Sequence, residues 1–152
     1  MTTCNLARIL MRFSITLLFA VTFVLAGFGK LLDASAPDWF VQQFAETPLG
    51  VLPQTPLFLS LALGESLLGL GAVISLFRGE WFRQRAPLLK LVLAGSLLMF
   101  VALGFGARLS HKYEDAASHV MYFTGTLLAL VVIDRDDRLA VSSEAKQTVL
   151  AE

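Results

Sequence analysis

Glu65 is the one charged residue in the apolar run from Leu57 to Phe77, and that run is long enough to cross a bilayer. A charge at such a depth costs about 2.5–3.5 kcal/mol on insertion scales, so an intramembrane carboxylate normally faces the interior of a helix bundle and has a partner. Lys30, in the last turn of the preceding apolar run, has a stem long enough to reach it. The two residues predict either a structural pair that fixes helix register or a polar anchor for a ligand or a proton.

Other polar side chains are expected at the same end of the bundle as Lys30. Arg108 and His111 close the third apolar run, and His119 opens the fourth. With Lys30 and Glu65 they would surround a pocket whose remaining walls are apolar and aromatic, which suits a quinone or a lipid headgroup. The alternative is that Lys30, Arg108, His111 and His119 are interfacial anchors wetted by headgroups.

The elements that must position these residues are transmembrane helices. The chain has 152 residues, of which 56% are hydrophobic and 16% are charged, and its mean hydropathy is +0.70. Four apolar runs approach the ~20 residues that span a bilayer. They cover residues 13–32, 57–77, 88–107 and 116–133. We therefore predict an all-α integral membrane four-helix bundle over residues 1–133. Residues 134–152 lack sustained apolar periodicity and are expected to form a charged cytoplasmic tail, frayed or partly helical, without chemistry of its own.

The first loop is predicted to contain a short helix between residues 35 and 46. Trp39, Phe40 and Phe44 fall on overlapping faces of such a helix, as in an element that lies in the membrane interface. We expect it to cover the outer end of the bundle, with Trp39 and Phe40 as a roof over the polar pocket.

Start and stop signals agree with the predicted spans. Thr55 and Pro56 offer an N-cap and a first-turn proline for the second span, and Pro87 opens the third. Gly79 is placed to end the second span.

Basic residues alternate between the loops in the way that sets membrane topology. Arg8 and Arg12 precede the first span, whereas the first loop is mainly acidic. The second loop is the most basic and holds Arg78, Arg83, Arg85 and Lys90. This pattern predicts a protein of the cytoplasmic (inner) membrane with both termini in the cytoplasm. Glu65 would then lie about eight residues, or ~12 Å, below the outer end of its helix.

A cleaved signal peptide is the alternative reading of the N-terminus. Arg8 and Arg12 precede an apolar run, and Ala34-Ser35-Ala36 resembles a signal-peptidase site. We expect a retained helix instead, because the run is too long for a signal peptide and is interrupted by Lys30 and Asp33 before the alanines.

Several classes of function are excluded or unsupported by the residue types. The net charge is zero, which argues against nucleic-acid binding, and Cys4 is the only cysteine, so the chain has no internal disulfide and no C-x-x-C pair. The His, Asp and Glu residues lack metal-ligand spacing, so no metal site is predicted. Haem ligation is unsupported because His111 and His119 both lie near the outer surface. The chain also contains no glycine-rich nucleotide-binding motif.

The sequence resembles the DoxX/DoxD-like family of small four-helix membrane proteins. The resemblance rests on Gly27-Phe28-Gly29-Lys30-Leu31 and on residues 64–71, Gly-Glu-Ser-Leu-Leu-Gly-Leu-Gly, with Arg12 and His119 in matching places. It covers residues 8–133. Members of this family are similar to the membrane subunit of thiosulfate:quinone oxidoreductase or associate with redox and oxidative-stress systems. The resemblance therefore implies a redox-linked membrane role with a quinone as the ligand, without implying that this chain catalyses a reaction alone.

Two departures from the family pattern bear on the substrate. The glycine-rich segment that often follows the fourth span is replaced here by Asp134 and further charged residues, and the paired cysteines of thiol-redox members are absent. Thiosulfate is accordingly not expected as the substrate.

Three functions compete at this point. The first is a non-autonomous membrane subunit of an oxidoreductase system, with a redox-protein partner and a quinone or lipid ligand between Lys30, Glu65, Arg108 and His119. The second is a non-catalytic assembly or chaperone-like membrane protein in which the Lys30–Glu65 pair is structural. The third is a transporter or proton pathway. The inner half of the spans lacks a continuous series of polar residues, which argues against this function.

Overall fold

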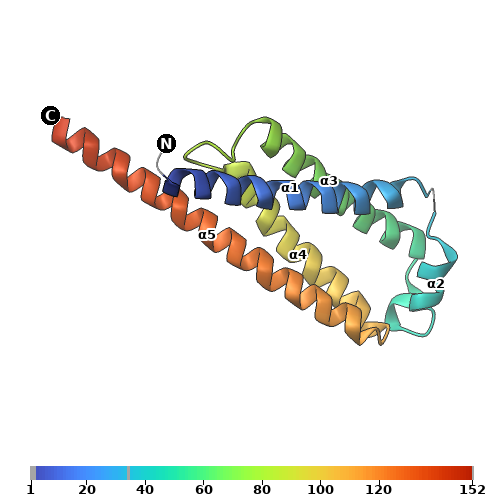
Figure 1. The fold of residues 1–152 in the computed structure, drawn as a ribbon. Helices are drawn as coiled ribbons and strands as arrows, with labels where there is room; N and C mark the ends of the chain where they lie inside the picture. Colours follow the sequence, from blue (N-terminus) through green and yellow to red (C-terminus); the bar gives the residue numbers. More distant parts are fainter. Residues whose placement is uncertain (1–2, 34, 152) are drawn as a thin grey trace.

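The computed structural model describes the backbone of residues 3–33 and 35–151, and the side chains of residues 5–33, 35–140 and 142. Over those residues the chain is all-helical (Figure 1). In chain order the elements are α1 (Thr3–Leu31), α2 (Asp38–Phe44), the 3-10 helix η1 (Pro48–Val51), α3 (Gln54–Phe77), α4 (Pro87–Leu109) and α5 (Tyr113–Ala151). Helices α1, α3, α4 and α5 are each long and apolar enough to cross a membrane, which confirms the predicted four-helix membrane fold.

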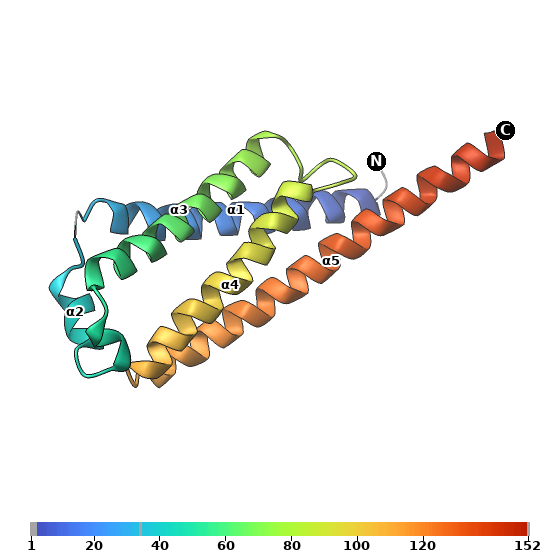
Figure 2. The same ribbon diagram turned by 180° about the vertical axis from the view of Figure 1, so that it is seen from behind.

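The bundle is built from two helix pairs that join along one seam. Helix α1 packs along α3, α4 packs along α5, and α3 contacts α4 between the pairs. Helices α1 and α5 lie together where α1 begins and then diverge toward α2 (Figures 1 and 2). We call the end that carries α2 and η1 the α2 end. The opposite end, which carries the α3–α4 loop with Arg78, Arg83 and Arg85, is the arginine end.

The surface of the bundle is apolar where a bilayer would surround it. Leu25 is 70% exposed and Leu98 is 74% exposed, and both lie within predicted spans. The buried core is formed by another set of apolar residues, with Phe19 and Phe23 from α1 packed against Leu89 and Leu93 from α4. Exposed apolar area of this extent on all four long helices indicates a lipid-facing surface.

Helices α1 and α3 approach most closely at two glycines. A Cβ placed on Gly27 would lie 2.5 Å from the hydroxyl oxygen of Ser66, and one on Gly69 would lie 2.8 Å from the backbone nitrogen of Val24. Because only a residue without a side chain fits at such contacts, the two glycines set the separation of the helices. Lys30 lies one turn beyond Gly27, so the same contact brings it near Glu65.

The helix boundaries agree with the sequence signals at two places and differ at a third. Pro87 is the first residue of α4, and Gly79 follows the end of α3 with a left-handed φ of 68°. The expected N-cap at Thr55 is wrong, because α3 begins at Gln54 with Pro53 as its N-cap. The Thr55 hydroxyl instead accepts a hydrogen bond from the backbone N–H of Ala36 at 3.4 Å.

The short helix in the first loop is present, as predicted, and α2 covers residues 38–44 of the predicted 35–46. Phe40 and Phe44 are buried, and the Phe40 ring lies 5.1 Å from the ring of Phe58 in α3. Trp39 is 56% exposed. The helix is therefore fixed to the α2 end by its phenylalanines, while the tryptophan faces outward as in an interfacial belt.

The segment after residue 133, expected to be frayed or partly helical, is helical to Ala151, because α5 continues from the fourth span without a break (Figure 1). Ile133, Asp137 and Ala140 are all buried, at spacings of four and three that mark one face of a helix. The polar Asp137 belongs to this buried face, so apolar residues alone do not mark the face in the sequence. Side chains beyond residue 142, and Ala34 in the suggested cleavage motif, lie outside the described residues.

Candidate functional site

The ammonium group of Lys30 contacts both carboxylate oxygens of Glu65. The Nζ–Oε1 and Nζ–Oε2 distances are 2.6 and 2.5 Å. The side chain of Glu65 is 3% exposed and that of Lys30 is 26% exposed. The predicted contact between the two residues is thus confirmed, and the buried carboxylate has its compensating charge.

The direction of helical side chains explains why these two residues meet. Cα–Cβ bonds in an α-helix tilt toward the N-terminus of the helix. In the antiparallel pair α1 and α3, Lys30 therefore extends from the last turn of α1 toward the membrane interior, while Glu65 leans back toward the α2 end. The ion pair therefore lies, along the bundle axis, between the backbone of Lys30 and the backbone of Glu65, beside the contact of Gly27 with Ser66.

Glu65 lies deeper than the sequence suggested. Helix α3 begins at residue 54, so Glu65 is the twelfth of its 24 residues. This places the carboxylate ~16 Å along the helix axis instead of ~12 Å. A carboxylate at mid-helix is close to the middle of a bilayer, where an unpaired charge is most costly.

A cavity of about 540 Å³ opens beside Glu65, where α1 and α5 diverge. Its walls are largely apolar or aromatic and come from all four long helices. Glu65, His119 and Tyr122 are the ionisable residues among the described side chains that line it. The lining residues are Ile15, Leu18, Phe19, Thr22, Phe23 and Ala26 of α1, Glu65 of α3, Phe100 and Leu103 of α4, and His119, Met121, Tyr122, Gly125, Thr126 and Ala129 of α5.

His119 lines this cavity, and one of its two ring nitrogens is bonded to the backbone. Its Nδ1 lies 2.6 Å from the backbone carbonyl oxygen of Asp115, which can only accept a hydrogen bond, so Nδ1 carries the proton. Nε2 of the neutral ring is therefore an acceptor. Phe100 and Tyr122 flank the imidazole at ring-centroid distances of 6.5 and 6.0 Å. The histidine is held in an aromatic wall with Nε2 left for a ligand.

Three residues expected at this pocket have other contacts. The guanidinium of Arg108 lies 4.5 Å from the ring centroid of Tyr113, as a cation–π pair. Phe40 is buried against Phe58, and the Trp39 ring lies 6.2 Å from that of Phe58. None of the three lines the cavity among the described residues. The roof and the ligand contact of Arg108 stay predictions, and α2 packs on the start of α3, away from the gap between α1 and α5.

A second polar cluster, at the arginine end, was missed by sequence reasoning. Arg12 is fully buried, and its guanidinium lies 2.9 Å from Asp137 and 3.6 Å from Asp136. It also donates to the backbone carbonyl of Arg83 at 3.1 Å. Asp137 in turn accepts from Lys90 at 3.0 Å. This ion network joins α1, α4, α5 and the α3–α4 loop.

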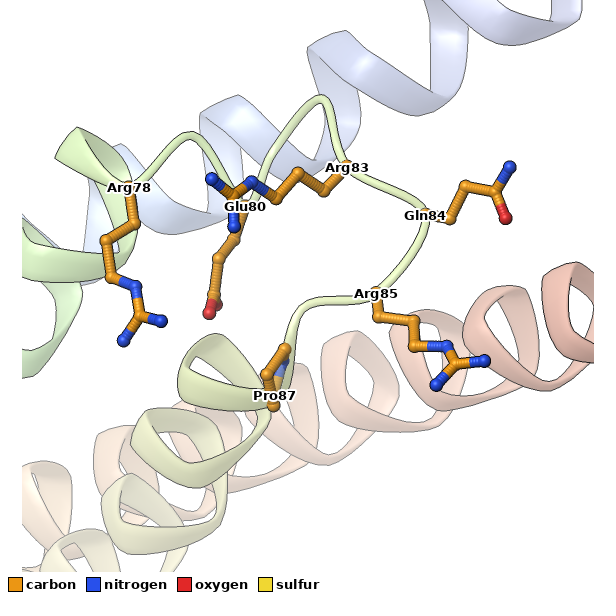
Figure 3. A pocket seen from close by; sticks show the side chains of 6 residues that line it. All are labelled: Arg78, Glu80, Arg83, Gln84, Arg85 and Pro87. Carbon is orange, nitrogen blue, oxygen red and sulfur yellow. The ribbon is translucent and has the colours of Figure 1, made fainter.

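Glu80 caps helix α4 from the same loop. It is 2% exposed, and its carboxylate accepts from the backbone N–H groups of Leu88 at 3.2 Å and Leu89 at 2.9 Å and from the Ser75 hydroxyl at 2.9 Å. Figure 3 shows Glu80 directed toward the start of α4, with Arg78 and Arg83 beside it in the loop. The free N–H groups of the first turn of α4 are thus satisfied by a side chain from outside the helix.

One signal in the sequence could have identified the ion network. Asp134, Asp137 and Arg138 recur at spacings of three and four, which continues the helical period of the fourth span. Arg12 directly precedes an apolar run. This position fits a buried arginine that neutralises a carboxylate as well as it fits an arginine in a solvated loop. The ambiguity of Arg12 is physical, because position alone does not distinguish a buried arginine from a wetted one.

The described residues contain no group of three or more His, Cys, Asp or Glu side chains that could hold a metal ion. Comparison with known proteins gives no further constraint on the site. No protein-family model, curated protein or solved structure matches this chain.

Proposed function

We propose that this protein is a small membrane subunit of a redox-linked system, similar to the DoxX/DoxD-like family, and that it binds a quinone-like ligand in the cavity beside Glu65. The observation that carries the proposal is the cavity itself, in which Glu65 and His119 lie in a largely apolar and aromatic lining. Its volume of about 540 Å³ is within the usual range of small-molecule sites, ~300–1,000 Å³.

The chemistry of the lining suits an amphipathic ring. Phe19, Phe23 and Tyr122 offer flat apolar contact to a ring. The neutral Nε2 of His119 and the carboxylate of Glu65 are both acceptors, so they favour the hydroxyl groups of a quinol over the carbonyl groups of a quinone. The reduced form of such a ligand is therefore expected to bind more tightly.

Access from the bilayer supports a lipid-soluble ligand. Leu18 and Met121 line the cavity, yet they are 63% and 73% exposed on the lipid-facing surface. The cavity is thus bordered by side chains that contact lipid, from α1 on one side and α5 on the other. A ligand dissolved in the bilayer has a lateral path to Glu65 and His119.

The proposal is tested by identifying what the purified protein retains. Native mass spectrometry and lipid extraction should recover a quinone from the wild type, and His119→Gln and Glu65→Gln should each lower the retained amount. His111→Asn is the matched control, because His111 also lies at the α2 end but bonds to the hydroxyl of Tyr113 at 3.0 Å and does not line the cavity. If folded Glu65→Gln retains as much quinone as the wild type, Glu65 does not bind the ligand.

A location in the cytoplasmic membrane with both termini in the cytoplasm is part of the proposal, supported by the basic residues at the arginine end. In a Cys4→Ala background, an impermeant thiol reagent added outside should label cysteines placed at Thr47 or Glu114 and spare one at Gln84. Labelling of position 84 from outside would reverse the orientation.

The second candidate is a non-catalytic assembly protein, and the geometry of the Lys30–Glu65 pair favours it specifically. Both carboxylate oxygens of Glu65 are bonded to Lys30, so the buried charge is compensated without any ligand. Under this reading Glu65→Gln destabilises the bundle, and no quinone is recovered from the wild type at any stage of purification.

A further inference from the structure

A second concave site lies between α4 and α5 at the arginine end, separate from the cavity beside Glu65. The cleft has a volume of about 720 Å³. Its deeper part is apolar and is formed by Leu91 and Ala94 of α4 with Leu130 and Val131 of α5. Leu91 is 68% exposed and Val131 is 55% exposed, so this part of the cleft is open to the acyl chains of a bilayer.

The outer part of the same cleft is basic. Lys90, Arg135 and Arg138 line it together with a single carboxylate, that of Asp134. Asp134 is shared by Lys90 at 3.3 Å and Arg138 at 2.7 Å. No carboxylate of the described residues lies within ion-pair distance of Arg135. Three cations facing one carboxylate leave the cleft with a positive charge.

The nearby carboxylate of Asp137 and the first backbone N–H groups of α4 already have other partners. Asp137 contacts Lys90, but it also compensates the buried Arg12 at 2.9 Å and accepts from the backbone N–H of Ala86 at 3.2 Å. The first N–H groups of α4 are occupied by Glu80. An anion in the cleft would therefore bind through the side chains of Arg135 and Arg138, which are exposed.

The neighbouring arginine pocket is less suited to a phospholipid. It has a volume of about 380 Å³ and is lined by Arg78, Arg83 and Arg85 (Figure 3). Glu80 also lines it, as Asp134 lines the cleft between α4 and α5, so the balance of charged residues does not distinguish the two pockets. Pro87 is its one apolar lining residue among those described, so the pocket offers no apolar surface along which an acyl chain could pack.

We propose that the cleft between α4 and α5 binds an anionic phospholipid, with the phosphate on Arg135 and Arg138 and one acyl chain along Leu91, Leu130 and Val131. The order of residues along α5 supports this occupant. Apolar residues 130 and 131 give way to charged residues 134, 135 and 138 within about two turns, which matches the change from acyl chain to phosphate at a bilayer surface.

The test is a lipid titration of the full-length protein followed by native mass spectrometry. Dioleoylphosphatidylglycerol should bind more tightly than dioleoylphosphatidylcholine. Each basic residue near an anionic membrane contributes about fivefold in affinity, so the double variant Arg135→Gln/Arg138→Gln should weaken phosphatidylglycerol binding by roughly 25-fold. Leu91→Trp, which fills the apolar part without changing the charge, should also weaken it.

The matched control is Arg78→Gln/Arg83→Gln, which removes the same charge from the same end but leaves the cleft intact. It should retain phosphatidylglycerol binding. An equal loss in both double variants would show a general surface attraction and overturn the site, as would equal binding of the two lipids by the wild type. Displacement of the lipid by millimolar inorganic phosphate, or undiminished lipid binding by Leu91→Trp, would show that the apolar part of the cleft does not bind an acyl chain, and would overturn the proposal.

Discussion

Gly27 and Ser66 are in direct backbone contact across helices α1 and α3, with no room for a side chain between them. A Cβ on Gly27 would lie 2.6 Å from the backbone nitrogen of Ser66 and 2.8 Å from its Cα. Backbone atoms cannot move aside as a flexible side chain can. The separation of the two helices, and with it the distance that Lys30 spans to reach Glu65, therefore depends on this glycine.

Gly27→Ala is expected to destabilise the bundle by about 1–3 kcal/mol, the usual cost of overpacking, because α1 and α3 must separate. Unfolding in mixed micelles of increasing SDS content measures the loss. Gly29→Ala is the matched control, since a Cβ there meets nothing within 4 Å. Alanine at position 29 should be neutral or stabilising through its better helix propensity. Equal stability of the two variants would mean that the close contact is not required.

Lys30 and Glu65 are expected to be thermodynamically coupled. Lys30→Met should cost about 3–5 kcal/mol, because it leaves Glu65 as an uncompensated buried charge, whereas Glu65→Gln should cost less because Lys30 is 26% exposed. The double variant should lose much less than the sum of the two, since neither charge then remains. The same SDS titration applied to all four proteins gives the coupling free energy. Simple additivity would show that the contact of 2.5–2.6 Å contributes nothing to stability.

Asp137 is expected to matter far more than its neighbour Asp136. Asp137→Asn removes the carboxylate that contacts both Arg12 at 2.9 Å and Lys90 at 3.0 Å, so a loss of about 3–5 kcal/mol is expected. Asp136→Asn is the control, because Asp136 is 3.6 Å from Arg12 and is 27% exposed. Thermal unfolding monitored by circular dichroism compares the two. A similar loss in both variants would argue against Asp137 as the centre of the network.

The Lys30–Glu65 contact could be predicted from the sequence because few arrangements satisfy a charge inside a bilayer. Hydropathy places Glu65 within a span, and a buried carboxylate needs a partner, which Lys30 supplies near the end of the preceding span. The number and approximate limits of the spans followed from the same physics. These inferences need no knowledge of how the helices are arranged around one another.

The position of the cavity could not be predicted in the same way. His119 lines the cavity together with Glu65, whereas Arg108, Trp39 and Phe40 do not, because the packing of α2 depends on shape. Phe44 fits above Gly106, with 3.4 Å between its ring and a Cβ placed there, and this contact holds α2 over the ends of α3 and α4. The hydrophobic periodicity of a sequence carries no information about such shape complementarity. The ion network was missed for a related reason, since a buried arginine and a wetted one have the same sequence pattern.

Glu80 is expected to stabilise the start of α4, although it belongs to the preceding loop. Glu80→Ala removes the acceptor for the N–H groups of Leu88 and Leu89 and for the hydroxyl of Ser75. The loss of a helix cap costs about 0.5–2 kcal/mol, and each buried donor left without a partner adds about 1–3 kcal/mol. Glu80→Gln keeps one carbonyl acceptor and should fall between the wild type and Glu80→Ala.

Hydrogen exchange at the amides of Leu88 and Leu89 separates this capping role from a general effect of charge. Both amides should exchange faster in Glu80→Ala, whereas amides in the middle of α4 should change only as far as global stability changes. Glu46→Ala, at an exposed position in the first loop, removes the same charge and should leave both amides as they are. If Leu88 and Leu89 remain protected in Glu80→Ala, the start of α4 is held by Pro87 and the packing of Leu89, and the carboxylate is dispensable.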